Sequence, residues 1–492
     1  MKQLIFVFLC LPTVLLAQVS SQPEYINFLK AKLIFDRAIQ FSGLQSDSLT
    51  IGISASGMMH ESGHFSTPDE RVDIPEAYTL RLFNGINNFY IDGLIKYQGR
   101  ELNRQVYVKE DSIFYRDHFD RGVNRDNLSH RVELYNEILT LHPALILTSA
   151  RQALRSLRYL GKTGNADLLS FSTNQVTFTL RVLPDGQLAE ASYLATHTYY
   201  GDNVHRYEYL DYKPVGGYQM PNRFREYEFG SLRKEQSFTY DLKPMAVLPT
   251  NQVCPGCALV AKNTSAGQVS IKSLGDSLYA AELNTYNNRV LFLVGVKDVT
   301  VFEAPIGYKA SQHVIDAIKQ KTGGKPITKI VVTHHHPDHA GGLRAFVEQG
   351  ASIVTTKENV AFFNRFVNYP HELEGRKESK RLKPTYLVID SVRTFNQADS
   401  ESFSVYFIGD TQHTKEHLVT YFPKQKVLFH GDLCFFRLTG ESAASVREQA
   451  VGKLINRYKL DVEKIYGSWP LKGFKEFGTK ADLNRKLELA TK

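Results

Sequence analysis

The sequence predicts an α+β protein of two domains. With 492 residues, the chain is too long for one ordinary hydrophobic core. Its first half consists mainly of short β-prone segments of alternating polarity, with few helices. Its second half arranges strands and helices around a histidine-rich run at residues 334–339. We therefore expect a β-rich first domain followed by a mixed domain that carries the chemistry.

Residues 23–250 are predicted to form an open or half-closed antiparallel barrel. One helix is expected near Tyr25–Phe41, and an amphipathic stretch with leucines at helical spacing covers Pro143–Leu160. The predicted strands are Ser48–Ser54, Tyr78–Phe83, Asn88–Ile91, Arg104–Lys109, Ser112–Tyr115, Leu168–Ser172, Gln175–Val182, Tyr207–Tyr212 and Ser237–Asp241. These elements favour a β-rich accessory domain with a half-barrel-like sheet.

Two segments late in this half suggest a lipophilic ligand. Tyr212–Pro221 followed by Phe224–Phe229 resembles the late hairpin of periplasmic lipoprotein-carrier half-barrels. The resemblance covers part of the region and includes no catalytic motif. It implies a cavity for an acyl chain, and the alternative is a scaffold that only supports the second domain.

The most informative run is His334-His335-His336-Pro337-Asp338-His339. It follows a β-branched segment, Ile327–Thr333, and precedes a segment that begins like a helix. On extended backbone His334 and His336 leave from the same side, whereas Asp338 and His339 follow the turn that Pro337 favours. Imidazole and carboxylate ligands suit zinc, iron or manganese. The alternative, a solvated histidine-rich turn, is disfavoured because four of sixteen histidines fall within six residues.

Further motifs follow in the same half of the chain. Gln412-His413-Thr414 precedes an apolar strand that ends at Pro423, and a second strand ends in Gly431-Asp432. Other predicted elements are strands at Gln268–Leu274, Leu278–Leu283, Val290–Val296, Val299–Phe302 and Ala351–Thr356, and a helix near Ser311–Lys321. In this order, residues 265–480 resemble the metallo-β-lactamase superfamily. The resemblance implies an αββα sandwich.

The resemblance also implies a set of metal ligands. A first metal would be held by His334, His336 and His413, and a second by Asp338, His339 and Asp432, with Asp432 reaching both. One or two zinc ions are expected, with iron or manganese as alternatives. A bound cation lowers the pKa of its water to about 7. Asp338 is the predicted catalytic residue, because an ionised carboxylate there can orient this water or accept its proton.

The chain departs from the family pattern in two places. No histidine follows His430, so the second metal lacks the late histidine that the family supplies. Trp469, or alternatively Ser468, stands at that place. Where the family has an aspartate before its first helix, this chain has Glu303, which we expect to orient a ligand histidine. The first departure leaves open a one-metal enzyme or a metal-binding sensor without turnover.

The other histidines and the cysteines are expected to have structural rather than catalytic roles. His60-Glu61-Ser62-Gly63-His64 matches the pattern of zinc peptidases, but that motif requires a helix, and its glycines favour a loop or hairpin. His335, His417 and His430 are expected not to bind metal. Cys254 and Cys257 suggest a local disulfide or strained turn, and Cys434 is expected to be buried.

The predicted organisation begins with a signal peptide at residues 1–17, because Leu4–Leu16 is apolar after Lys2. The β-rich domain (23–250), a linker with Cys-Pro-Gly-Cys (251–264), the hydrolase-like domain (265–480) and a C-terminal helix or tail (481–492) follow. The apolar run is too short for an ordinary transmembrane helix. We therefore expect export from a bacterial cytoplasm, to the periplasm or the medium.

Composition limits the partners. The net charge of +8 is modest for this length. The sequence has no basic stripe with interleaved aromatic residues, so it does not predict nucleic-acid binding. The sequence thus predicts an exported metal-dependent hydrolase acting on a small ester, lactone, thioester or amide. The alternatives are a metal-binding sensor and a carrier of a lipophilic ligand. The sequence does not define the oligomeric state.

Overall fold

The computed structural model describes most of the chain. The described residues are 12–44, 50–83, 88–97, 100–116, 123–127, 131–197, 199–243, 269–374, 381–396, 402–440 and 442–491. They divide into two compact units. Unit 1 contains residues 1–60, 73–195 and 204–261, and unit 2 contains residues 61–72, 196–203 and 262–492.

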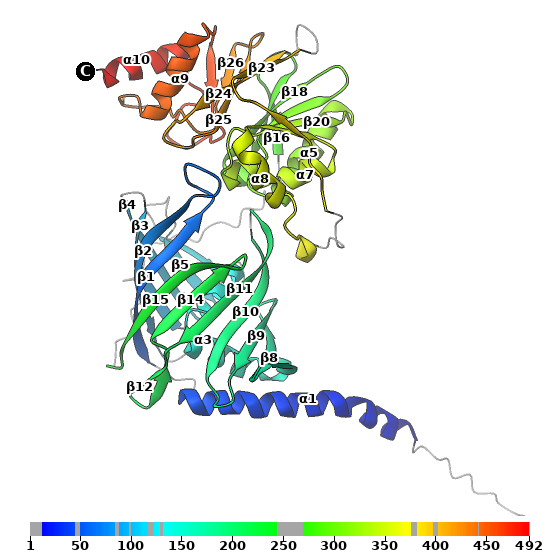
Figure 1. Cartoon of the computed structure of the whole chain (residues 1–492), viewed down its shortest axis with the longest axis vertical. Helices are drawn as coiled ribbons and strands as arrows, with labels where there is room; N and C mark the ends of the chain where they lie inside the picture. Colours follow the sequence, from blue (N-terminus) through cyan, green and yellow to red (C-terminus); the bar gives the residue numbers. More distant parts are fainter. Residues whose placement is uncertain are drawn as a thin grey trace, which may run out of the picture. The chain divides into compact units, whose positions relative to one another are not determined.

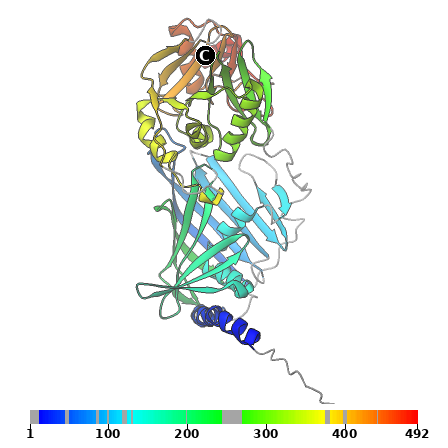
Figure 2. The ribbon, with the colours of Figure 1, turned by 90° about the vertical axis from the view of Figure 1, so that its right-hand side faces the viewer.

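Unit 1 is built on one 13-stranded sheet (Figures 1 and 2). Its strand order is β6-β5-β4-β3-β2-β1-β15-β14-β11-β10-β9-β8-β7, so the first strand pairs with the last. The strands are β1 Ile51–Ser62, β2 Arg71–Leu82, β3 Asn88–Tyr97, β4 Arg100–Lys109, β5 Ser112–Arg116, β6 Val123–Asn127, β7 Arg158–Thr163, β8 Ala166–Thr173, β9 Val176–Val182, β10 Leu188–His197, β11 Gly201–Leu210, β14 Arg223–Glu228 and β15 Ser231–Asp241. The separate hairpin β12 Lys213–Val215 and β13 Tyr218–Met220 completes the strands. The predicted strand-rich first half is confirmed.

In the described part of unit 1, three α-helices accompany this sheet, namely α1 Pro12–Ser42, α2 Val132–Leu139 and α3 Pro143–Gln152. Residues 143–150 of α3 are all buried, and α2 and α3 share one core cluster with the sheet. The predicted helical stretch to Leu160 is wrong at its C-terminal end. The helix ends at Gln152, and Leu160 lies 54% exposed in β7, at a register shift between Tyr159 and Gly161, which pair with β8. Leucine spacing alone did not reveal this change, because sheet pairing overrides the helical period.

Unit 2 contains two sheets in the C-terminal half (Figure 1). The first has the order β16 Val269–Ser273, β17 Leu278–Leu283, β18 Asn288–Val294, β19 Val299–Phe302, β20 Ile327–Val331, β21 Ser352–Thr355 and β22 Tyr386–Val388. The second has the order β23 Val392–Phe395, β24 Phe403–Gly409, β25 His417–Phe422, β26 Val427–Phe429 and β27 Lys464–Tyr466. The helices are α5 Tyr308–Thr322, α6 Pro337–Ala340, α7 Leu343–Glu348, α8 Lys357–Phe366, α9 Val446–Arg457 and α10 Lys480–Ala490.

The side chains of unit 2 form three hydrophobic cores, and neighbouring residues of one strand belong to different cores. On β18, Leu291 belongs to a core shared by both sheets, whereas Phe292 belongs to a core that includes α5 and α7. On β25, Leu418 faces the shared core, whereas Val419 packs in a third core with α9 and α10. Successive residues of a strand point to opposite faces, so each sheet is buried on both sides. The layers are therefore helix, sheet, sheet and helix, and the predicted αββα sandwich is confirmed.

Several predictions concern single segments. The predicted helix near Tyr25–Phe41 lies within α1, and Cys434 is a buried free cysteine as predicted. Residues 1–11 and the linker with Cys254 and Cys257 lie outside the described residues. Among the described helices, none combines the length and apolar character needed to cross a membrane. The predicted domain boundaries stay predictions.

Candidate metal centre

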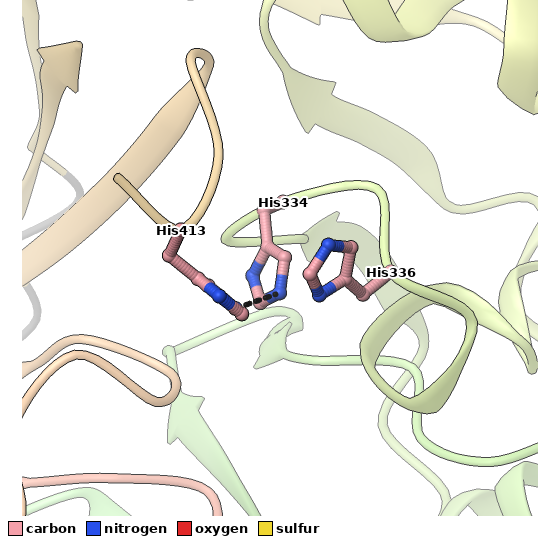
Figure 3. Close-up of side chains that lie close together, drawn as sticks. All are labelled: His334, His336 and His413. Atoms are coloured by element: carbon pink, nitrogen blue, oxygen red, sulfur yellow. Dashed lines mark hydrogen bonds between the residues drawn. The ribbon is translucent and has the colours of Figure 1, made fainter. Parts of the chain in front are cut away.

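Three histidine side chains converge beyond the end of β20 (Figure 3). Buried Ile327, Ile330 and Val331 hold this strand in the sheet, and the chain then bends through residues 333–335 before α6 begins. His334 and His336 come from this connection between β20 and α6, and His413 comes from the connection between β24 and β25. One nitrogen from each lies within 4.8 Å of the other two, and the Nε2 atoms of His334 and His413 are 3.2 Å apart.

The hydrogen bonds of His334 and His336 determine which ring nitrogen is free. The Thr333 hydroxyl donates to Glu303 at 2.6 Å, so it accepts from His334 Nδ1 at 2.9 Å. His336 Nε2 donates to the carbonyl oxygen of Phe65 at 3.0 Å. The lone pairs therefore remain on Nε2 of His334 and Nδ1 of His336. Metal-binding histidines commonly donate their other N–H to a carbonyl or a polar side chain in this way.

The electrostatics of this group suit a metal. Burial and the neighbouring imidazoles hold the pKa values of His334 and His336 well below the ordinary histidine value. Both rings are therefore neutral at pH 7, which is the form that coordinates a cation.

Carboxylate side chains lie beside the three histidines. Together with His339 they mark the place where a second metal ion is expected, which we call the second position. Asp432, which follows β26, has Oδ2 2.8 Å from His413 Nε2 and 3.9 Å from His339 Nε2. Asp338 and His339 lie in α6, and Asp338 Oδ2 is 3.5 Å from His339 Nε2. Glu303 Oε1 lies 3.4 Å from His339 Nδ1, as expected for a residue that orients this ring.

Charged side chains around His339 shift its pKa and that of Asp338. Burial would lower the pKa of His339, but Asp338, Glu303 and Asp432 raise it to about 10. Burial would raise the pKa of Asp338, but His339 and His64 lower it to about 2. Three acidic side chains thus face one imidazole in the interior.

Buried polar atoms test whether a cation fits here. Asp432 Oδ1 and Glu303 Oε2 are buried and have no hydrogen-bond partner. A buried carboxylate oxygen without a partner is costly, and a bound cation would satisfy it. Tetrahedral zinc bonds place neighbouring donor atoms about 3.3 Å apart. The donor atoms of His334 and His413, 3.2 Å apart, match this spacing. The residues present therefore fit a metal ion.

All six predicted ligand residues lie at this one place. Of the six, His334, His336 and His413 form one close group, whereas Asp338 and His339 join no group of three donors within 4.8 Å among the described residues. Asp432 groups instead with His334 and His417. His417 uses both nitrogens elsewhere, because Nε2 donates to the His430 carbonyl at 2.9 Å and Nδ1 lies 3.3 Å from the Thr414 hydroxyl. These bonds leave His417 no free donor atom.

The remaining histidines and the tryptophan have other partners. Buried His335 contacts Glu416 through Nδ1. His430 accepts a bond from the backbone N–H of Leu433 at 3.0 Å. Trp469 Nε1 lies 3.4 Å from His339 Nε2, so the indole lies beside the second position, where an indole cannot replace a histidine ligand.

Sequence reasoning missed one side chain at this site. The segment His60–His64 is not helical, as expected, since β1 ends at Ser62 and Gly63 follows with φ +94°. Its histidine nevertheless lies at the metal centre, with His64 Nε2 3.3 Å from Asp338 Oδ1. Its position beside a glycine at a strand end was a weak signal, because sequence spacing does not reveal a contact across 274 residues.

The comparisons with known proteins concern the half of the chain that carries this site. Residues 293–469 match the family model of the metallo-β-lactamase superfamily. The resemblance predicted from the histidine and Gly-Asp motifs is thereby confirmed for the C-terminal region, and this half of the chain has the metallo-β-lactamase fold.

Two curated relatives are similar to part of this chain. The chain is 32% identical over 170 residues to "Metallo-beta-lactamase type 2" of Elizabethkingia meningoseptica, covering 33% of this chain and 61% of that protein. It is 29% identical over 148 residues to "Metallo-beta-lactamase IND-1" of Chryseobacterium indologenes, covering 30% of this chain and 55% of that protein. The chain therefore spans less than two thirds of either relative.

Solved structures show a further likeness. A metallo-β-lactamase from Pontibacter korlensis is 21% identical with a TM-score of 0.35, covering 46% of this chain and 99% of its own. The metallo-β-lactamase FIM-1 from Pseudomonas aeruginosa, in a mono-zinc form, is 18% identical with a TM-score of 0.33, covering 45% of this chain and 95% of its own.

Proposed function

We propose that unit 2 is a metal-dependent hydrolase of small molecules that contain an ester, lactone, thioester or amide bond. The observation that carries the proposal is the convergence of His334, His336 and His413 beside ionised Asp432. Three imidazoles and a carboxylate in this arrangement are the donor set of catalytic zinc sites. The metallo-β-lactamase fold of this half supports zinc as the ion, with iron and manganese as the alternatives.

The mechanism assigns separate tasks to the side chains. A zinc ion held by His334, His336 and His413 would polarise the substrate oxygen and make hydroxide available at neutral pH. Asp338, ionised at pH 7 because its pKa is about 2, accepts a hydrogen bond from the attacking water and orients it. Glu303 holds the ring of His339 through Nδ1. No serine or cysteine nucleophile is needed, so the reaction has no covalent protein intermediate.

Trp469 favours a second candidate function. Its indole Nε1 lies 3.4 Å from His339 Nε2, the nitrogen that a second ion would need. A protein that binds one metal and senses a ligand without turnover would use the same three histidines. Turnover distinguishes the two candidates.

The test measures metal content and hydrolysis together. Full-length protein is offered chromogenic esters, lactones, thioesters and β-lactams, before and after removal of metal by a chelator and addition of zinc. We expect chelator-sensitive turnover, with Asp338→Asn about 100-fold slower or more because a general base is lost. His313→Ala, in a helix that supplies no donor, serves as the control. Bound metal without turnover on any substrate would favour the sensor.

Two further predictions concern the rest of the chain. We propose export on the basis of the apolar N-terminal segment. The proposed lipophilic ligand of unit 1 is tested by mass spectrometry of lipid that copurifies with the protein. Protein without lipid would contradict the carrier.

A further inference from the structure

The connection between β1 and β2 is anchored inside unit 2. The Phe65 carbonyl accepts from His336 Nε2 at 3.0 Å, and the Ser66 carbonyl accepts from the backbone N–H of Lys415 at 2.8 Å. Asp69 also forms an ion pair with Arg365. The first two contacts reach the loop that carries His336 and the connection that carries His413, and the third reaches α8. The connection is therefore part of the metal centre's surroundings.

The same connection places an imidazole over the second position. His64 Nε2 lies 3.3 Å from Asp338 Oδ1. Its ring centroid is 5.2 Å from that of His336 and 6.1 Å from that of Tyr199. Asp338 Oδ1 is buried and receives no well-aligned hydrogen bond, although His64 is close to it. The two atoms thus face one another as two ligands of one ion would.

The second position has three candidate donors besides His64. His339 supplies an imidazole, and Asp338 and Asp432 supply carboxylates, whereas zinc sites with only protein ligands use four. We propose that His64 is the fourth protein ligand of a second zinc ion held with Asp338, His339 and Asp432. The inference depends on the proposed metal centre and is independent of turnover.

The distances define what must change when the ion binds. The separation of 3.3 Å between His64 Nε2 and Asp338 Oδ1 matches the edge of a zinc tetrahedron, which is about 3.3 Å long, whereas His339 Nε2 lies 3.5 Å from the other oxygen of Asp338, Oδ2. The four side chains are not gathered around one point, since none of their possible triplets lies within 4.8 Å among the described residues. Binding must therefore draw His64 inward, and its side chain, 32% exposed, has the freedom to move. Binding must also replace the 3.4 Å contact of Trp469 with His339 Nε2.

The experiment counts zinc ions on the full-length chain. Wild type, His64→Ala, His64→Cys and His60→Ala are dialysed with zinc and analysed by mass spectrometry, and zinc is titrated against a chromogenic chelator. His60 is the matched control, because it lies in the same hairpin and pairs with Asp73 at 2.5 Å. Cobalt titration reports the geometry of each site through its visible absorption, without any substrate.

We expect two zinc ions in wild type and in His60→Ala, and one in His64→Ala. The dissociation constant of the second ion should rise about 100-fold or more in His64→Ala, because one of four ligands is lost. His64→Cys should restore the second ion, since thiolate is a zinc ligand. Unchanged affinity in His64→Ala, or a single zinc in wild type, would overturn the proposal. Two bound zinc ions without hydrolysis would instead contradict only the proposed function.

Discussion

Replacing His413 by alanine tests the assignment of the first metal. The change removes one of the three nitrogens that lie within 4.8 Å of one another. Zinc binding to four-ligand protein sites is worth about 10–16 kcal/mol, or about 2.5–4 kcal/mol for each ligand. At about 1.4 kcal/mol for each factor of ten, the dissociation constant should rise about 100- to 1000-fold. Zinc titration with a competing chelator measures this change on the full-length protein.

His335→Ala is the matched comparison from the same histidine run. His335 and Glu416 contact one another with side chains that are 0% and 1% exposed. Removing the imidazole leaves a buried carboxylate without its partner, which costs about 3–5 kcal/mol in the free energy of unfolding. The zinc dissociation constant should change less than about tenfold, because no ligand is lost. Equal zinc losses in the two variants would refute the ligand assignment.

Three further predictions test the surroundings of the site and of unit 1. Glu303→Gln should weaken zinc binding about 10- to 100-fold in a chelator titration, because the charge that orients His339 is removed. Gly431→Ala should lower the free energy of unfolding by about 1–3 kcal/mol in urea denaturation, since φ is +69° and the new Cβ would lie 2.6 Å from the Thr333 hydroxyl; unchanged stability would contradict this packing. Burial lowers the pKa of His142 to about 3, below the unfolded value of 6.5, so its contribution to stability is complete above pH 6.5 and is lost as the pH falls toward 3. His142→Asn, which can still cap α3, should therefore show a shallower fall in unfolding free energy over this range, by up to about 5 kcal/mol, and identical slopes would exclude the effect.

Local patterns predicted the elements of unit 2 well. The predicted strand Val299–Phe302 coincides with β19, and the predicted helix near Ser311–Lys321 lies within α5. In these two segments the spacing of the apolar residues already matches the element that forms. Their conformation could therefore be predicted without knowledge of tertiary contacts. Beyond residue 152 the leucine spacing was misleading, because pairing with β8 determines the conformation of Arg158–Thr163.

The candidate site was only partly predictable for a similar reason. His334, His336, Asp338 and His339 lie within six residues, so their proximity follows from the backbone. His413 and Asp432 required a family resemblance, because only the fold brings their loops to the end of β20. His64 had neither kind of support. Its position depends on contacts such as the one between Phe65 and His336, which are 271 residues apart.

The discontinuous make-up of unit 2 has a practical consequence for anyone who truncates the chain. A fragment beginning at residue 262 would omit the stretches 61–72 and 196–203. It would keep both sheets of the sandwich but forfeit the oxygen that fixes the tautomer of His336. Weak zinc affinity in such a fragment would be a consequence of the truncation. The zinc affinity of the metal centre should therefore be measured on the full-length chain.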